Sequence, residues 1–260
     1  MGFLTDVLAQ TRRDLADRPL DLPALEAAAA ARPPARPWAA ALRTGSPAVI
    51  AEVKRASPSA GDIAPGVDPV SQARAYEAAG AAAISVLTEP RYFGGSLEDL
   101  ARVRAAVGVP VLRKDFLLQP VQVLEARAAG ADAILVIASA ADDPSLASLL
   151  GSASELGMGV LLETHGEEDL ERALATDQEV VGINARDLES LEVDVHAALE
   201  RLRQVPAGRT AVLESGIASR ADAVAAVEAG ASAILVGEAL MRAPDPSAKV
   251  RQLRGEEAER

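Results

Sequence analysis

Short apolar segments alternate with amphipathic helical segments along most of the chain. Three junctions resemble one another: EAAGAAAISVLTE from Glu77, ARAAGADAILVIA from Ala126 and AVEAGASAILVGE from Ala226. In each, a helical segment rich in alanine ends at a glycine suited to a helix C-terminus, and a β-branched apolar run follows. This internal repeat predicts a series of helix-to-strand units.

Five further apolar runs bring the predicted strands to eight; they cover 48–53, 109–112, 159–162, 180–183 and 210–213. Helical patterns separate the strands at 69–79, 97–106, 121–129, 144–156, 167–175, 195–202 and 220–229. Eight alternations predict an α/β fold of the (β/α)8 class, a TIM barrel, over residues 46–255. The alternative is a doubly wound open sheet, but its usual strand number and its glycine-rich first turn do not match this chain.

The first 45 residues stand outside this repeat. They contain a helical pattern at 3–15, a second one at 22–31 and the proline-rich connector RPPARPW. A loose tail is one interpretation. We predict instead an N-terminal helical extension, residues 1–45, packed on the barrel, because five apolar side chains at helical spacing need burial: Phe3, Leu4, Val7, Leu8 and Leu15. We expect Trp38 to serve packing.

Composition narrows the classes of function. The net charge of −12 and the six aromatic residues oppose a nucleic-acid or anionic-membrane partner. No window approaches the run of about 18 apolar residues that a membrane helix needs, so a cytoplasmic protein is expected. The absence of cysteine excludes disulfides and thiolate metal sites, and the isolated His165 and His196 predict no metal site. We expect both histidines to be surface residues without partners.

Polar residues lie at the predicted carboxyl ends of six strands, where barrels of this class carry catalytic groups. They are Glu52 and Lys54, Lys114, Glu163, Asn184 and Arg186, Glu214 and Ser215, and Gly237. Any one charge there could simply begin a solvated loop. The three glutamates, however, interrupt or close apolar strands, where an unpaired carboxylate is costly to bury. Their natural partners are Lys54 and Lys114.

The rarity of lysine makes these positions informative. Of 26 basic residues only three are lysines, and two of the three lie at strand ends. Arginine is a fixed cation, whereas a desolvated lysine can lose its proton. A chain that otherwise prefers arginine is expected to keep lysine where a proton moves. We therefore predict that Lys114, in VLRKDF, is a general acid.

Two further strand ends indicate phosphate recognition. ESGIASRADA places Ser215 and Gly216 before a helix that Ser219 can cap, and VGEAL places Gly237 and Glu238 before another. Glycine lets backbone N–H groups approach an anion, and the loops after strands seven and eight often bind phosphate in barrels. A tight turn also needs glycine, so one such strand end is weak evidence for a phosphate site. Two of them, after strands seven and eight, are stronger evidence.

The segment RASPSAGDIAPG, residues 55–66, is long for a barrel loop. It predicts either an ordinary surface loop or a lid that closes over substrate.

Seven motifs, in order and with matching spacing from about residue 35 to 245, resemble the indole-3-glycerol phosphate synthase family: AEVKRASPSAG, SVLTEPRYFGGS, VLRKDF, ETHGEEDLERAL, GINARDL, ESGI and VGEALM. The resemblance implies a barrel enzyme that closes 1-(2-carboxyphenylamino)-1-deoxyribulose 5-phosphate to an indole with loss of carbon dioxide and water. It implies Lys114 as the general acid at the substrate carbonyl and Glu163 as a general acid/base. Glu52 and Lys54 would assist dehydration. No cofactor or metal is implied.

The resemblance also implies the groups that bind the substrate. Asn184 would position the substrate and Glu214 would position the lysines. Groups around substrate oxygens would be Arg186, Ser215, Gly216 and Gly237. The aromatic ring would pack on Pro58, Phe116, Leu135 and Leu188, with Ser57 beside them. Glu238 stands where the family often has serine, so we expect its carboxylate to turn away and only its N–H to face the phosphate.

Two other functions compete with this interpretation. The first is a phosphoribosylanthranilate isomerase. Proteins of that family resemble one another in having a cysteine general base at the end of the first strand, and this chain has no cysteine. A non-catalytic phosphate-binding barrel would lack one of the expected catalytic groups, and all are present. We expect a sugar-phosphate ligand and a monomer.

Overall fold

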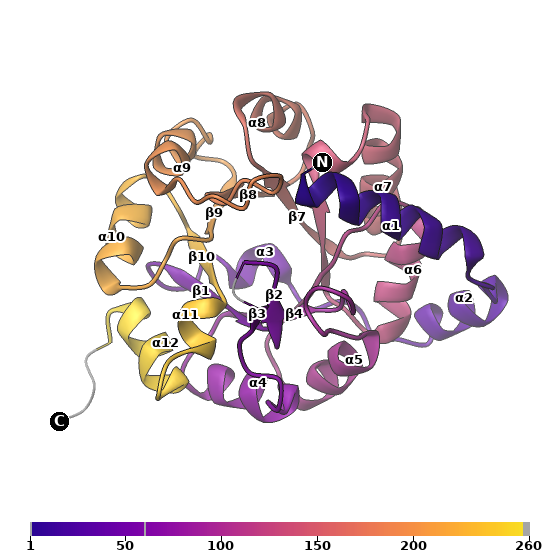
Figure 1. The fold of residues 1–260 in the computed structure, drawn as a ribbon, viewed down its shortest axis with the longest axis horizontal. Coiled ribbons are helices and arrows are strands. Elements are labelled where there is room, and N and C mark those ends of the chain that lie inside the picture. Colours follow the sequence, from indigo (N-terminus) through magenta and orange to yellow (C-terminus); the bar gives the residue numbers. More distant parts are fainter. Residues whose placement is uncertain (1, 60, 257–260) are drawn as a thin grey trace.

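A computed structural model describes residues 2–59 and 61–256. Within them, parallel strands form a closed barrel in which neighbours follow chain order (Figure 1). The eight strands are β1 (Ala48–Val53), β4 (Ala83–Leu87), β5 (Val111–Lys114), β6 (Ala133–Ile137), β7 (Gly159–Thr164), β8 (Val180–Asn184), β9 (Thr210–Glu214) and β10 (Ala233–Val236). The predicted (β/α)8 fold is confirmed. The predicted strand 109–112 begins two residues later, because Pro110 has no N–H to donate to the sheet.

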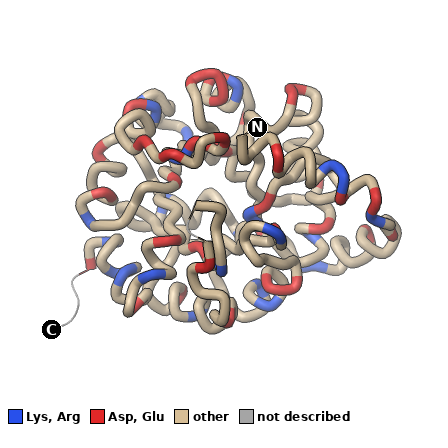
Figure 2. The backbone as a smooth tube through the Cα atoms, viewed as in Figure 1, with Lys and Arg blue, Asp and Glu red and all other residues tan. Residues whose placement is uncertain are grey.

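Helices surround the barrel. They are α4 (Pro69–Ala78), α5 (Leu97–Ala106), α6 (Pro120–Ala129), α7 (Asp143–Glu155), α8 (Glu167–Leu174), α9 (Val195–Leu202), α10 (Arg220–Glu228), α11 (Glu238–Met241) and α12 (Pro246–Arg254), with a short 3-10 turn at Ala138–Ala140. Ser219 caps α10 as predicted: its side chain accepts from the N–H of Asp222. Acidic and basic positions are interspersed around this ring (Figure 2). No helix of the described residues is long and apolar enough to cross a membrane.

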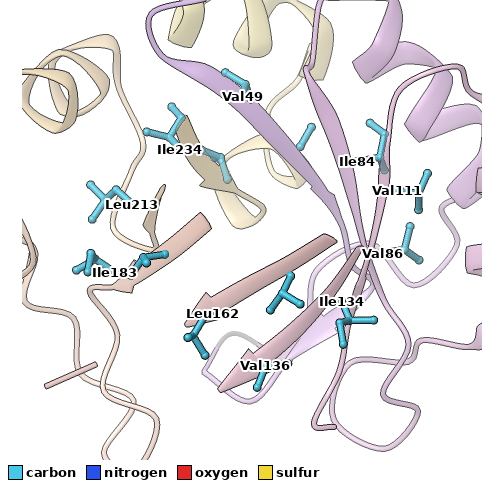
Figure 3. Close-up of a cluster of buried hydrophobic side chains, with 14 of the residues drawn as sticks. Val49, Ile84, Val86, Val111, Ile134, Val136, Leu162, Ile183, Leu213 and Ile234 are labelled. Atoms are coloured by element: carbon cyan, nitrogen blue, oxygen red, sulfur yellow. The ribbon is translucent and has the colours of Figure 1, made fainter. Parts of the chain in front are cut away.

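Alternation along the strands divides the core in two. Outward side chains, such as Val49, Ile84 and Ile234, pack beneath the surrounding helices (Figure 3). Inward side chains, such as Ile50 and Leu112, fill the barrel interior. Neighbouring residues of a strand face opposite sides, so residues two apart face the same side. Glu52, two positions after Ile50, and Lys114, two positions after Leu112, therefore also face inward.

The N-terminal segment contacts both ends of the barrel. Helix α1 (Phe3–Asp17) crosses the side of the mouth, and its Leu4, Val7 and Leu8 are buried in the same cluster as the barrel interior. Helix α2 (Leu22–Ala30) lies against α6. Helix α3 (Trp38–Ala41) lies at the other end, with the buried Trp38 against Gly159, the first residue of β7. Trp38 thus serves packing.

A buried carboxylate joins this segment to the barrel. Asp132 has no solvent exposure and precedes β6. One carboxylate oxygen accepts from the backbone N–H of Arg36 (2.7 Å) and from Nη2 of Arg104 (3.0 Å), and the other accepts from the N–H of Val111 (2.9 Å). Arg36 also donates to the carbonyl of Val109 (2.6 Å). The connector after α2 is therefore held by a charge in the protein interior.

Candidate active site

The inward side chains end in a polar layer at the carboxyl ends of the strands. It consists of Glu52 in β1, Lys114 in β5, Glu163 in β7, Asn184 in β8 and Glu214 in β9. Lys54 follows β1 two positions after Glu52, on the same side. All six residues line one cavity of about 110 Å³. The predicted site depends on this convergence, because catalytic groups on separate faces of the barrel could not contact the same substrate.

Lys114 lies at the centre of the layer. Its Nζ is 3.2 Å from Oε2 of Glu163 and 3.6 Å from Oε2 of Glu214. Asn184 donates from Nδ2 to the other oxygen of Glu163 (3.0 Å). Glu163 is 1% exposed, so its two oxygens are fixed between a cation and an amide. Asn184 in turn accepts, through Oδ1, the backbone N–H of Arg186 (3.0 Å).

A second ion pair stands beside the first. Nζ of Lys54 lies 3.1 Å from Oε1 of Glu52, and the hydroxyl of Ser85 donates to Oε2 of Glu52 (3.4 Å). Because Gly237 has no side chain, there is room beside it for this ion pair. A Cβ at that position would lie 2.3 Å from Oε1 of Glu52 and 3.0 Å from Nζ of Lys54.

Burial and neighbouring charges shift the pKa values of two groups in the layer. Burial alone would lower the pKa of Lys114, but the carboxylates of Glu163, Glu214 and Glu52 outweigh burial and raise the pKa, so the ammonium form is held. Burial, reinforced by the negative charge of Glu163, raises the pKa of Glu214 well above its usual range. Both shifts favour the protonated form, at Lys114 and at Glu214, and so reduce the negative charge of the layer.

The lining of the cavity also includes apolar side chains. Pro58, Phe116, Leu135 and Leu188 line it, and Ser57 lies among them. The structure therefore brings together every residue that was predicted to contact the aromatic ring.

An adjoining cavity of about 410 Å³ is lined by the residues that were predicted to bind phosphate. Its lining includes Ser215, Gly216, Gly237 and Glu238, and it shares Lys54 and Arg186 with the first cavity. Ser215 (φ 66°) and Gly216 (φ 72°) both adopt left-handed backbone conformations. For a serine this conformation is strained, and such strain is concentrated at functional sites.

The side chain of Glu238 lines both cavities and pairs with an arginine there, so its turning away from the phosphate stays a prediction. It accepts from Nε of Arg242 (3.0 Å), one turn further along the chain. Arg242 lines the same cavity, so its cation offsets the carboxylate. The pair is half exposed, and we assign it little energy.

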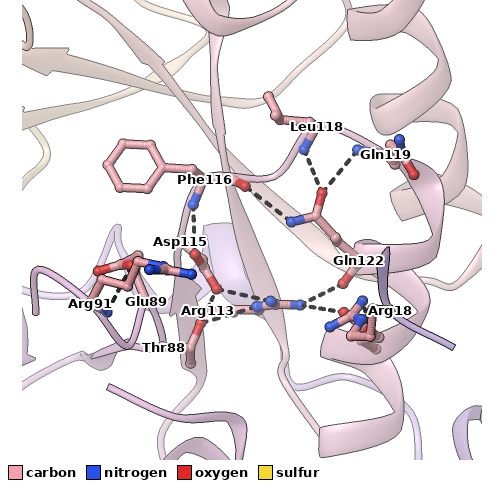
Figure 4. Close-up of polar contacts among 11 residues, drawn as sticks. Arg18, Thr88, Glu89, Arg91, Arg113, Asp115, Phe116, Leu118, Gln119 and Gln122 are labelled. Carbon is pink, nitrogen blue, oxygen red and sulfur yellow. Dashed lines mark hydrogen bonds and ion pairs between the residues drawn. The ribbon is translucent and has the colours of Figure 1, made fainter. Parts of the chain in front are cut away.

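The residues on either side of Lys114 support its strand. Because strand residues alternate, Arg113 points away from the cavity and is buried among hydrogen-bond acceptors (Figure 4). It donates to the Thr88 hydroxyl (3.1 Å), the Gln122 carbonyl (2.7 Å) and the Asp115 carboxylate (2.9 Å). Asp115 also accepts the N–H of Phe116 (2.9 Å). The motif thus supplies one inward cation and two structural charges.

Sequence reasoning missed an aromatic cluster. Phe3, from α1, lines the cavity and meets Tyr92 edge-on at 5.1 Å between ring centres and Phe116 at 6.3 Å. Phe93 lies 6.4 Å from Phe116. Four of the six aromatic residues of the chain therefore form one cluster, and Phe3, Phe93 and Phe116 from it line the cavity. Aromatic residues, like lysines, are rare in this chain, so their positions in the sequence could have indicated the site in the same way.

The prediction that His165 has no partners is wrong. Its Nδ1 lies 3.1 Å from the carbonyl of Asn184, and its Nε2 lies 3.2 Å from Oδ2 of Asp187. It follows Glu163 by two residues and reaches across to the loop after β8. No local pattern in the sequence marks a contact of this kind. His196 is exposed, as expected.

The long loop after β1 is partly ordered as a small hairpin. β2 (Ala56–Ser57) pairs with β3 (Gly61–Asp62), and Arg55 anchors the base by binding Asp99 (2.6 Å) and the carbonyl of Gly94 (2.9 Å). Residue 60 lies outside the described residues. A lid that closes over substrate stays a prediction.

Replacing Gly237 by alanine is expected to lower kcat/KM about 10- to 100-fold, because the added methyl group displaces the Glu52–Lys54 pair. Steady-state kinetics measure the effect. The matched control is Gly208→Ala, since a Cβ at Gly208 meets no atom within 4 Å. An unchanged kcat/KM in the Gly237 variant would show that the pair has no part in turnover.

Paired amines and carboxylates beside a second cavity, at the carboxyl ends of barrel strands, define an acid–base enzyme of the (β/α)8 class. The family model described as indole-3-glycerol phosphate synthase matches residues 4–253. The chain belongs to the indole-3-glycerol phosphate synthase family.

Similar proteins agree with that membership. The chain is 50% identical to indole-3-glycerol phosphate synthase of Nocardioides sp. (strain ATCC BAA-499 / JS614), covering 99% of this chain and 100% of the relative. It is 49% identical to the protein of that name from Mycobacterium ulcerans (strain Agy99), covering 96% and 93%. A crystal structure of 3-hexulose-6-phosphate synthase superposes with a TM-score of 0.63 at 19% identity, covering 81% of this chain and all of that one, and supports the fold alone.

Proposed function

We propose that the two cavities bind 1-(2-carboxyphenylamino)-1-deoxyribulose 5-phosphate and that the polar layer closes it to indole-3-glycerol phosphate, releasing carbon dioxide and water. The observation that carries this proposal is the contact of Lys114 with Glu163 and Glu214 in a cavity that aromatic side chains also line. Family membership supplies the reaction class.

In this proposal Lys114 begins the reaction. Its ammonium group donates a proton to the carbonyl oxygen of the sugar chain, so that the carboxylate-bearing ring carbon can form a bond to the carbonyl carbon. Breaking the carboxylate–ring bond then releases carbon dioxide and leaves the bonding electrons in the ring. The neighbouring carboxylates keep Lys114 protonated before the substrate arrives, which is the state a general acid requires.

Dehydration completes the ring. The hydroxyl formed at the former carbonyl carbon departs with a proton, and a proton leaves the adjacent carbon as the new double bond forms. We propose that Glu163 exchanges protons in this half of the reaction, assisted by Glu52 and Lys54. Asn184, which holds one oxygen of Glu163, would keep the carboxylate aimed at the substrate. Glu214 would hold Lys114 in place.

The two cavities would bind different parts of the substrate. The aromatic ring would lie on Phe116, Leu135, Leu188 and Pro58, with Ser57 and Phe3 beside it. The phosphate would lie in the second cavity, near Arg186, Lys54 and the backbone of Ser215, Gly216, Gly237 and Glu238. Every assigned group comes from one chain, and we propose a monomer that acts in the cytoplasm, with residues 1–45 as an extension of a barrel domain at 46–255.

A direct assay tests the proposal. The purified protein is given the carboxyphenylamino sugar phosphate, and the indole product is followed by its fluorescence. We expect turnover by the wild-type protein and none above background by the Lys114→Ala variant. Folded wild-type protein without turnover would remove the proposal, and the isomerase and the non-catalytic barrel would be considered again.

A further inference from the structure

The first turn of α1 has no capping side chain of its own. Gly2 occupies the N-cap position, and its hydrogen side chain cannot accept a bond. The loop after β8 supplies acceptors instead. The N–H of Phe3 donates to the carbonyl of Glu189 (3.1 Å), and the N–H of Leu4 donates to the carbonyl of Leu188 (2.9 Å).

The side chain of Glu189 completes this contact. Its Oε1 accepts the hydroxyl of Thr5 (2.6 Å), and its Oε2 accepts the N–H of Thr5 (3.3 Å). A Cβ on Gly2 would fall 1.8 Å from Oε2, so the carboxylate lies directly over the helix N-terminus. A negative charge there is favourable, because the free N–H groups give that end of a helix a partial positive charge.

The loop that carries Glu189 is itself fixed to the barrel. Oδ1 of Asp187 accepts the N–H groups of Glu189 (2.8 Å) and Ser190 (2.6 Å). Oδ2 of Asp187 pairs with His165, whose other ring nitrogen contacts the carbonyl of Asn184. Contacts therefore run from β8, which carries a proposed catalytic amide, to the first turn of α1.

Both sides of this junction line the first cavity. Phe3 enters it from α1, and Leu188 and Arg186 enter it from the loop. We propose that Glu189 is a positioning residue: it caps α1 from another part of the chain and so holds Phe3 and Leu188 together as one wall against the aromatic ring of the substrate. This inference rests on the proposed function. Glu189 is exposed and touches neither the cavity nor the polar layer.

The test compares Glu189→Ala with Glu189→Gln and with Glu192→Ala. Gln keeps an acceptor for the Thr5 hydroxyl. Glu192 is an exposed glutamate of the same loop, and its substitution is the matched control. Hydrogen exchange is measured on the full-length protein without substrate, at the amides of residues 3–5, and KM and kcat are measured for the same proteins.

In Glu189→Ala we expect exchange at these amides to rise about 5-fold or more, the change that corresponds to losing a helix N-cap. We expect KM to rise by about the same factor while kcat stays within about 2-fold, because Lys114 and Glu163 are untouched. Glu189→Gln should recover most of both losses, and Glu192→Ala should match the wild type.

Faster exchange with an unchanged KM would overturn the positioning role, and unchanged exchange would overturn the cap itself. A matching rise of KM in Glu192→Ala would also overturn the assignment to Glu189. These outcomes all occur in an active enzyme, whereas a wild-type protein without turnover would overturn the proposed function and this inference together.

Discussion

Replacing Lys114 by arginine is expected to lower kcat by about 100- to 10,000-fold, the contribution typical of a general acid. Arginine keeps the positive charge between Glu163 and Glu214, so substrate binding is expected to change little. The guanidinium, however, does not release its proton at any working pH. Single-turnover fluorescence measures the chemical step, and titration with the product measures binding.

The third lysine provides the control for this substitution. Lys249 lies on α12, and its Nζ binds only the side chain of Gln252 (2.8 Å) among the described contacts. Lys249→Arg should keep wild-type kcat and KM. A Lys114→Arg variant with wild-type kcat would exclude the general-acid role, whereas one that had lost product binding would assign Lys114 to recognition.

Much of the fold follows from the order of apolar segments. Eight apolar runs, each followed by a helical pattern, leave few packing solutions, and the parallel barrel buries every run on both faces. The polar layer was predictable for the same reason. Glu52 and Lys54 are two apart on one strand, so they share a face, and the carboxyl ends of all parallel strands meet at one mouth.

Contacts between distant segments were not predictable in this way. Phe3 lies at helical spacing with Leu4 and Val7. This pattern predicts that Phe3 is buried, but it does not show which residues Phe3 contacts. Only the docked helix brings Phe3 to Phe116. His165 and Asp187 likewise belong to different loops, and their pairing depends on how two strand ends sit side by side. Exposed residues such as Glu189 carry no pattern at all, because solvent accepts many side chains there.

Protonation is a further property that the sequence leaves open. Three glutamates and two lysines suggest a net negative site. Burial beside Glu163 raises the pKa of Glu214, and a proton on Glu214 would bring the site close to neutrality. A balanced site is suited to an anionic substrate, since an excess carboxylate would repel both the carboxylate and the phosphate of the ligand.

Replacing Asp132 by alanine is expected to have the largest effect on stability. The variant leaves Arg104 and the backbone N–H groups of Arg36 and Val111 without their acceptor in the protein interior. Removing one member of a buried ion pair costs about 3–5 kcal/mol, because the remaining charge stays desolvated. Equilibrium unfolding in urea measures the loss of free energy.

Asp143→Ala is the matched control for this substitution. Asp143 also pairs with an arginine, Arg172 (2.8 Å), but its side chain is 84% exposed. Exposed pairs contribute about 1 kcal/mol or less, so this variant should unfold close to the wild type. Equal losses in the two variants would mean that burial is not what makes Asp132 important. A larger loss in Asp132→Ala would support the view that this single carboxylate holds the N-terminal connector on the barrel.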